Sequence, residues 1–156
     1  MESSLEWRTE MQFECHTRGI KTFLDASVEH GGHDAGPNPK ELILNAMMGC
    51  TAMDVISMLV KMRQKPNRFL MNIRAEKSEV PPVYFKKAKM NYFLYGDLEN
   101  EKVLKAVQAS MEKYCGVNFM ISLSCEISYE VFLNDVSIGL GHPQFPQNHL
   151  HESRPS

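Results

Sequence analysis

Residues 36–64 decide the fold, and they read GPNPKELILNAMMGCTAMDVISMLVKMRQ. The stretch opens with a helix-start pattern in which Asn38 suits the N-cap, a proline follows at the first helical position, and Glu41 completes a capping box. Basic residues gather at its far end, where they complement the helix dipole, and Pro66 ends the helix. The stretch therefore predicts one long, mostly apolar helix from Asn38 to about Gln64, with Cys50 deep inside it.

Segments with strand-like patterns lie on both sides of this helix. They are rich in β-branched and aromatic residues and are separated by turn residues such as glycine and proline. A turn at residues 17–19 joins the first two, and Val80-Pro81-Pro82 joins the next two. The predicted strands are residues 5–14, 20–25, 68–79, 84–96 and 120–133.

A second, amphipathic helix is expected at residues 99–115, where apolar side chains recur at spacings of three and four. Gly116 fits the position that follows a helix end. We expect one domain over residues 1–133 and a loose tail over residues 134–156, which is rich in proline, glutamine, histidine and serine. Strands that follow one another in hairpins form antiparallel sheets, so the predicted class is α+β.

The first predicted helix is apolar around most of its circumference. One amphipathic partner helix cannot cover it fully, so it must lie between sheets or against a second copy of itself. The sequence therefore predicts a homodimer.

Composition excludes several classes of function. The net charge of −2 over 156 residues offers no positive field for a nucleic acid. Polar residues interrupt the apolar run 42–60, so we expect a core helix and no membrane partner. The amino end has no apolar core of signal-peptide length, which predicts a cytoplasmic protein. Four cysteines in such a chain are expected to be reduced thiols at rest.

Two of these cysteines, Cys50 and Cys115, lie on different predicted helices. A buried cysteine is most often only a small apolar side chain, but a pair can form a transient disulfide. Cys50 is too far from the helix start for the dipole to activate it, so a cation must come from elsewhere: Arg8, Arg18 or Lys40. Cys115 is expected at a helix carboxyl end, which disfavours a thiolate and suits a resolving thiol.

The helix 36–64, followed by Cys115 in the run SMEKYC, resembles the OsmC/Ohr family (osmotically inducible protein C and organic hydroperoxide resistance proteins). The likeness covers roughly residues 5–133. The detail Cys-Thr-Ala-Met-Asp-Val at Cys50 is similar to an OsmC-like branch that is less characterised than the standard peroxidases. The resemblance implies an intertwined homodimer in which antiparallel sheets from both chains wrap two central helices.

The resemblance also implies a chemistry. Cys50 maps to the peroxidatic nucleophile and Cys115 to the resolving cysteine, which implies reduction of organic hydroperoxides. No bound cofactor is implied, and a dithiol such as dihydrolipoamide is the expected reductant. An arginine of the amino-terminal sheet stabilises the thiolate in the family, and Arg18 is our candidate. Met47 and Met53 are candidates for lining an apolar substrate pocket, although methionine more often fills gaps in a core.

The sequence departs from the family at the helix start. The standard peroxidases have a glutamate directly after the helix-start proline, where this chain has Lys40, and Glu41 is one step along. One step turns about 100° around a helix, so Glu41 cannot take the same place. This leaves a second function open: a non-enzymatic dimer that binds a small apolar ligand or senses redox state.

The remaining candidates have simpler explanations. Cys15 and Cys125 are expected to pack in strands. His30 and His33 match no standard zinc spacing, so we expect a solvated loop and no metal site. Asp54 lies one helical turn after Cys50. It could hold a proton, but we expect it to accept a hydrogen bond from a partner helix, because an anion beside Cys50 opposes thiolate formation.

Overall fold

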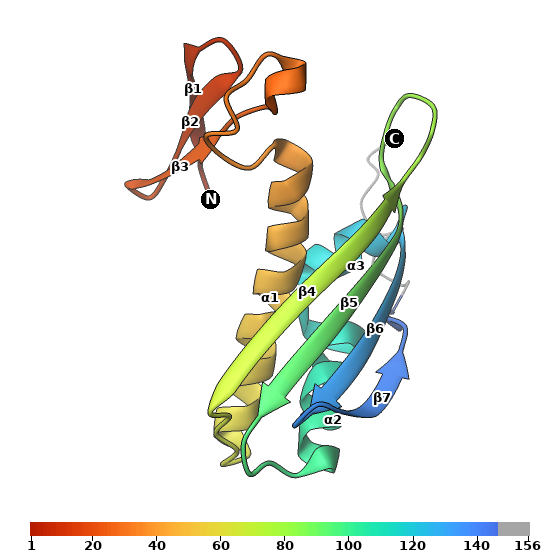
Figure 1. Cartoon of the computed structure of the whole chain (residues 1–156). Helices are drawn as coiled ribbons and strands as arrows, with labels where there is room; N and C mark the ends of the chain where they lie inside the picture. Colours follow the sequence, from red (N-terminus) through yellow and green to blue (C-terminus); the bar gives the residue numbers. More distant parts are fainter. Residues whose placement is uncertain (147–156) are drawn as a thin grey trace, which may run out of the picture. The chain divides into compact units, whose positions relative to one another are not determined.

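A computed structural model describes residues 1–146 of the chain (Figure 1). The chain forms two compact units, Met1–Asn45 and a second that begins at Ala46. Helix α1 (Pro39–Lys61) begins in the first unit and continues into the second.

The first unit contains a three-stranded antiparallel sheet in the order β1-β2-β3. The predicted strand 5–14 is in fact two strands, because the chain reverses at Glu10, whose φ is 45°. Glutamate rarely adopts this left-handed conformation, so the sequence pattern did not signal the turn. The strand predicted at residues 20–25 is confirmed as β3. The strands are β1 (Ser4–Thr9), β2 (Gln12–Thr17) and β3 (Ile20–Leu24), and a short 3-10 turn, η1 (Val28–His30), follows them.

Large apolar side chains of the first unit are exposed in the single chain. The side chain that β2 buries most completely is charged: Glu14 is 3% exposed and forms ion pairs with Arg8 at 2.7 Å and Lys21 at 2.7 Å. A small sheet without an apolar core needs cover from another surface. The exposed apolar residues are Leu5, Trp7, Met11, Ile20, Phe23 and Val28.

Helix α1 starts as predicted. Asn38 Oδ1 accepts hydrogen bonds from the backbone N–H groups of Lys40 and Glu41, at 3.0 and 3.1 Å. Glu41 Oε2 in turn accepts the N–H of Asn38 at 2.8 Å. The capping box is therefore confirmed. The Glu41 carboxylate is engaged in this cap, where it accepts a backbone hydrogen bond.

The second unit is built on a four-stranded sheet in the order β4-β5-β6-β7. The pairs β4–β5 and β6–β7 are antiparallel, but β5 and β6 are parallel, which corrects the expectation of purely antiparallel sheets. The reason is the helical connection between β5 and β6, which returns the chain to the end of the sheet where β5 began. The strands are β4 (Arg68–Lys77), β5 (Phe85–Tyr95), β6 (Glu126–Leu133) and β7 (Val136–Gly141).

That connection is three helical pieces rather than the single predicted helix: α2 (Asn100–Ala109), a π turn η2 (Ser110–Tyr114) and α3 (Gly116–Ser122). Gly116 directly follows the C-cap Cys115, as predicted, but it also begins α3. Residues up to Ser122 are helical, and the final predicted strand therefore starts only at Glu126. The run 117–121, which is apolar apart from Asn118, has no glycine or proline to distinguish a short helix from a strand.

The prediction of a loose tail from Asn134 onward is wrong for Val136–Gly141, which forms β7. Asn134 and Asp135, with φ of 48° and 65°, make the tight turn that folds β7 back onto β6. Two successive left-handed residues match the twist of a hairpin. Residues 147–156 of the predicted tail lie outside the described part.

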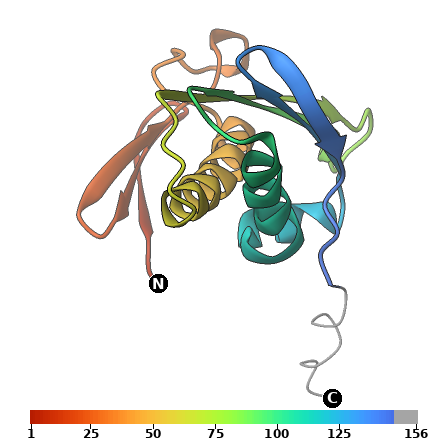
Figure 2. The ribbon, with the colours of Figure 1, turned by 90° about the horizontal axis from the view of Figure 1, so that it is seen from below.

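Two helices lie on one face of this sheet: α2 and the part of α1 that follows Ala46 (Figure 2). Helix α1 is long and apolar enough to cross a membrane by length and composition. Core helices meet the same criterion, and this one buries a stripe at intervals of four residues. The stripe is Met47, Thr51, Val55 and Leu59. The α+β class is confirmed.

Candidate functional site

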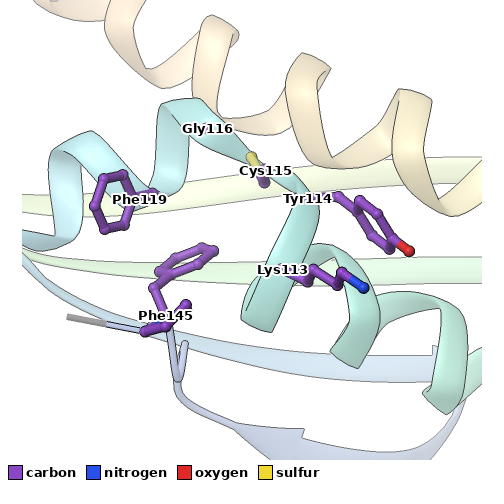
Figure 3. A pocket seen from close by; sticks show the side chains of 7 residues that line it. Lys113, Tyr114, Cys115, Gly116, Phe119 and Phe145 are labelled. Atoms are coloured by element: carbon purple, nitrogen blue, oxygen red, sulfur yellow. The ribbon is translucent and has the colours of Figure 1, made fainter. Parts of the chain in front are cut away.

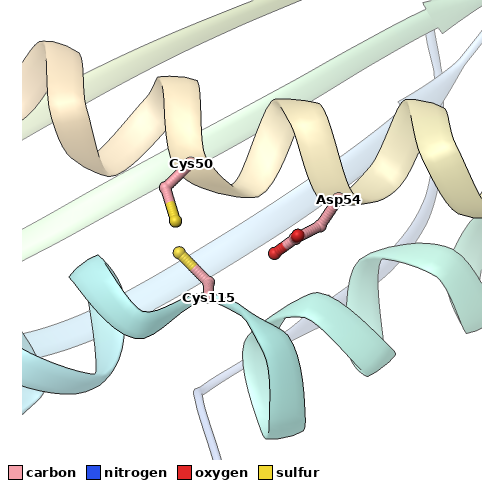
Figure 4. Close-up of side chains that lie close together, drawn as sticks. All are labelled: Cys50, Asp54 and Cys115. Carbon is pink, nitrogen blue, oxygen red and sulfur yellow. The ribbon is translucent and has the colours of Figure 1, made fainter.

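Two cysteines and one carboxylate meet between α1 and the η2–α3 junction (Figure 4). Cys50 comes from α1 and is half-buried, whereas Cys115 lies between η2 and α3 and is 1% exposed. The two sulfurs and a carboxylate oxygen of Asp54 all lie within 4.8 Å of one another. Both thiols are free. The structure therefore brings together the two cysteines that the sequence singled out.

The backbone at Cys115 ends one helical segment and begins another. Its N–H donates to the carbonyl oxygen of Ser110 at 2.9 Å, which closes the π turn. Its sulfur accepts the N–H of Asn118 at 3.4 Å, so Cys115 is the N-cap of α3 as well as the end of η2. The prediction that Cys115 lies at a helix carboxyl end is confirmed, but the residue also caps the start of a second helix, which the sequence pattern did not predict. Isolated π turns often occur at functional sites.

Burial is the main influence on the Cys115 thiol. Desolvation raises its pKa, and the Asn118 N–H lowers it only in part, so the pKa lies well above the ordinary value of a thiol. The neighbouring Cys50 and Asp54 raise it further. Cys115 is therefore protonated at neutral pH, which agrees with a resolving rather than an attacking thiol.

Asp54 belongs to a chain of hydrogen-bonded hydroxyl groups. Ser110 Oγ donates to Asp54 Oδ2 at 2.9 Å and also lies 2.9 Å from Thr51 Oγ1. Thr51 Oγ1 lies 2.9 Å from the hydroxyl of Tyr92 on β5. Ser110, Thr51 and Tyr92 are fully buried. The prediction that Asp54 accepts a hydrogen bond from a partner helix is confirmed, with Ser110 as the donor.

Asn118 ties α3 to α1. Its side-chain N–H donates to the backbone oxygen of Met47 at 3.3 Å, and the residue is fully buried. Its Oδ1 has no hydrogen-bond partner among residues 1–146. Sequence reasoning gave no role to Asn118, Ser110 or Thr51. The one signal was that Ser110 and Thr51 are small polar residues in otherwise apolar helical segments, and Asn118 lay outside the predicted helices.

The two methionines that were predicted to contact substrate differ in burial. Met47 is fully buried in the core, whereas Met53 is 76% exposed on α1. A cavity of about 380 Å³ lies instead beside Cys115 (Figure 3). Its walls are mostly apolar, with Phe119 and Phe145 packed edge to face at 5.7 Å. The residues lining it are Lys113, Tyr114, Cys115, Gly116, Phe119, Phe145 and Pro146.

The three candidate cations belong to the first unit. Arg18 lies in the turn between β2 and β3, with φ of 52°. Arg8 is held by two carboxylates, Glu14 at 2.7 Å and Glu6 at 3.2 Å. Lys40 is in the first turn of α1.

Cys50, Asp54 and Cys115 are residue types that can bind a metal, but burial keeps the Cys115 thiol protonated, and a thiol must lose its proton to become a ligand, so we assign no metal to this cluster. The two loop histidines have other partners: His30 contacts Ser27 at 2.8 Å and His33 contacts Glu10 at 3.1 Å.

Comparison with known proteins shows the family of the chain. The family model for OsmC-like protein matches residues 31–130. Protein YhfA of Escherichia coli strain K12 is 38% identical over 101 residues, which cover 63% of this chain and 75% of YhfA.

Solved structures share the fold. A hypothetical protein from Aquifex aeolicus is 29% identical with a TM-score of 0.73, over 85% of this chain and 96% of its own. An organic hydroperoxide resistance protein OsmC from Legionella pneumophila is 16% identical with a TM-score of 0.64, over 84% and 95%. The chain, with its two cysteines facing each other across α1 and the η2–α3 junction, belongs to the OsmC-like family.

Proposed function

We propose that this protein is a thiol-dependent peroxidase that reduces organic hydroperoxides through a Cys50 sulfenic acid and a Cys50–Cys115 disulfide. The observation that carries the proposal is the pair of free sulfurs within 4.8 Å of each other on separate elements. The two sulfurs of a disulfide are about 2.05 Å apart, so a short side-chain movement would bring the pair to bonding distance. Membership of the OsmC-like family supports a redox-related role.

The difference in exposure supports the assignment of roles. Cys50 is half-buried, whereas Cys115 is enclosed, so Cys50 is the sulfur that meets the peroxide. The Cys50 thiolate attacks the outer peroxide oxygen and the O–O bond breaks. The sulfur becomes a sulfenic acid, and the alkoxide leaves and takes up a proton as the alcohol.

The second half of the cycle restores the thiols. Cys115 attacks the sulfenic sulfur, an S–S bond forms and water leaves. An external dithiol, such as dihydrolipoamide, then reduces this disulfide by exchange and is itself oxidised to a disulfide. No resident cofactor takes part in either half.

A homodimer completes the proposal. In the single chain, Met53 and Val60 on α1 and Trp7 and Phe23 in the first unit are exposed. Exposed apolar surface of this kind, spread over both units, favours a second copy of the chain as its cover. The dimer is the form in which we expect the peroxidase to act.

The cavity beside Cys115 favours a second candidate, a dimer that binds a small apolar ligand without chemistry. Phe119, Phe145 and Tyr114 give it walls that suit an apolar molecule. In that case Phe119→Ala weakens binding of the ligand, and Cys50→Ser leaves the function intact.

The experiment that separates the two candidates is consumption of cumene hydroperoxide with dihydrolipoamide as reductant. We expect Cys50→Ser to abolish consumption, because a hydroxyl lacks the nucleophilicity of a thiolate. Cys115→Ser should complete one turnover and stop at a sulfenic acid that dimedone traps. Cys15→Ser is the matched control and should behave as wild type. Chelator-treated protein should keep its activity. Consumption by Cys50→Ser at the wild-type rate would overturn the peroxidase proposal.

A further inference from the structure

Formation of the disulfide requires that Cys115 lose the proton of its thiol. A thiol attacks as its thiolate, but the Cys115 sulfur is buried and its pKa is raised, so the proton must be removed as the S–S bond forms. In the same step the oxygen of the Cys50 sulfenic acid leaves as hydroxide, which needs a proton to become water. One group placed beside both sulfurs could serve both needs.

Asp54 occupies that place. Its carboxylate lies within 4.8 Å of both sulfurs, and Figure 4 shows it directed toward the gap between them. Ser110 holds it there: the Ser110 hydroxyl donates to Asp54 Oδ2, and the Ser110 carbonyl accepts the N–H of Cys115. A single residue of the π turn therefore fixes the carboxylate relative to Cys115.

The hydroxyl chain behind Asp54 suits both of its protonation states. One hydroxyl carries one proton, so Ser110 donates either to Asp54 or to Thr51 at any moment. When Asp54 is ionised, Ser110 donates to it. When Asp54 is protonated, Asp54 can donate to Ser110 and the Ser110 proton turns to Thr51. Each arrangement keeps Ser110 and Asp54 hydrogen-bonded. A change in the charge of Asp54 therefore leaves neither group without a hydrogen-bond partner.

We propose that Asp54 is the general acid–base group of the thiol pair, taking the proton of Cys115 as that sulfur attacks the Cys50 sulfenic acid and passing it to the departing hydroxide. This step rests on the proposed peroxidase function. The S–O bond of Cys50 breaks and the S–S bond forms. Cys115 is oxidised, Cys50 is reduced from the sulfenic level, and one water leaves. On reduction, Asp54 returns a proton to the Cys115 sulfur as it departs from the disulfide.

The test uses two readouts of the full-length protein. In the first, one equivalent of cumene hydroperoxide is added, and sulfenic acid and disulfide are followed by dimedone trapping and mass spectrometry. We expect Asp54→Asn to form sulfenic acid at least as fast as wild type, because it removes an anion beside Cys50, but to form the disulfide on the order of 100-fold more slowly. In the second, the disulfide is made with diamide, which needs no peroxidase activity, and its reduction by dithiothreitol is timed.

The pH profile distinguishes proton transfer from a structural effect. Below the pKa of Cys115, disulfide formation in Asp54→Asn should rise about tenfold per pH unit, because only the thiolate attacks without a base. The wild-type profile should be flatter. The titratable groups that face Asp54 are Cys50 on its own helix, Cys115 at the η2–α3 junction and, through Thr51, Tyr92 on β5.

Matched variants complete the design. Asp97→Asn makes the same chemical change at an exposed site and should match wild type, and Asp54→Glu should restore a flat pH profile even if it reacts more slowly. Wild-type rates for Asp54→Asn in the diamide assay at every pH would overturn the role of Asp54. Absence of sulfenic acid in wild type would overturn the peroxidase function separately, and the diamide assay would still decide whether Asp54 serves the thiol pair.

Discussion

The backbone N–H of Asn118 donates a 3.4 Å hydrogen bond to the sulfur of Cys115. Cys115 is thus the N-cap of helix α3, and the side chain of the same Asn118 donates a hydrogen bond to the Met47 carbonyl on α1. The position of Cys115 opposite Cys50 therefore depends on contacts of α3 as well as on the end of η2.

The two thiols should differ in reactivity. We expect iodoacetamide at pH 8 to modify Cys50 before Cys115, because Cys115 is 1% exposed and burial raises the pKa of its thiol. Peptide mapping by mass spectrometry over a time course gives the order. Modification of Cys115 first, in folded protein, would contradict the assignment of roles.

Stability should fall at alkaline pH in a way that depends on Cys115. Its pKa is raised in the folded protein, so the proton is bound more tightly there than in the unfolded chain. The resulting stabilisation is complete below about pH 9, the ordinary value, and is lost as pH rises toward the folded pKa of about 12. Urea denaturation should show a shallower fall in the free energy of unfolding between pH 9 and 11 for Cys115→Ser than for wild type. Cys15→Ser is the control and should follow wild type, whereas parallel curves for Cys115→Ser and wild type would contradict the assignment.

Loss of the α1 cap should destabilise the protein. Asn38→Ala removes the oxygen that accepts two backbone N–H groups, and such a loss typically costs about 1 kcal/mol. Denaturant titration measures the change. Asn38→Ser keeps an acceptor at the N-cap and should recover most of the loss; if both variants unfold alike, the cap does not stabilise α1.

The protein should be a stable dimer. Light scattering should give about twice the chain mass of 17.8 kDa at micromolar concentration, because both units leave apolar surface exposed in one copy. Met53→Glu on α1 should weaken the assembly, whereas Lys61→Glu at the end of the same helix should do so less. A folded monomer of wild type at that concentration would rule out the dimer.

Arg18 should contribute to activation of Cys50. Arg18→Ala is expected to slow sulfenic acid formation at neutral pH and to shift its rate profile toward higher pH, because a nearby guanidinium favours the thiolate. Arg18→Lys keeps a positive charge and should retain part of the rate. Arg8→Ala is the comparison, since Arg8 is already paired with Glu14 and Glu6. An unchanged pH–rate profile for Arg18→Ala would contradict the assignment of Arg18 to the site.

The sequence determined those features that depend on neighbouring residues. Asn38 and Glu41 act within one helical turn, so the start of α1 was predictable to the residue. The hairpin of β4 and β5 follows from two strand patterns with Val80-Pro81-Pro82 between them. The cysteine pair was found through the residues around it and the family resemblance they carry.

Tertiary structure decided the features that join distant segments. The parallel pairing of β5 with β6 follows from the path of the α2–α3 connection, which no local pattern records. The N-cap role of Cys115, the hydrogen bond from Ser110 to Asp54 and the link from Thr51 to Tyr92 each depend on which elements pack together. Buried polar groups must find partners wherever packing places them, so their identities emerge only when helix and sheet are assembled.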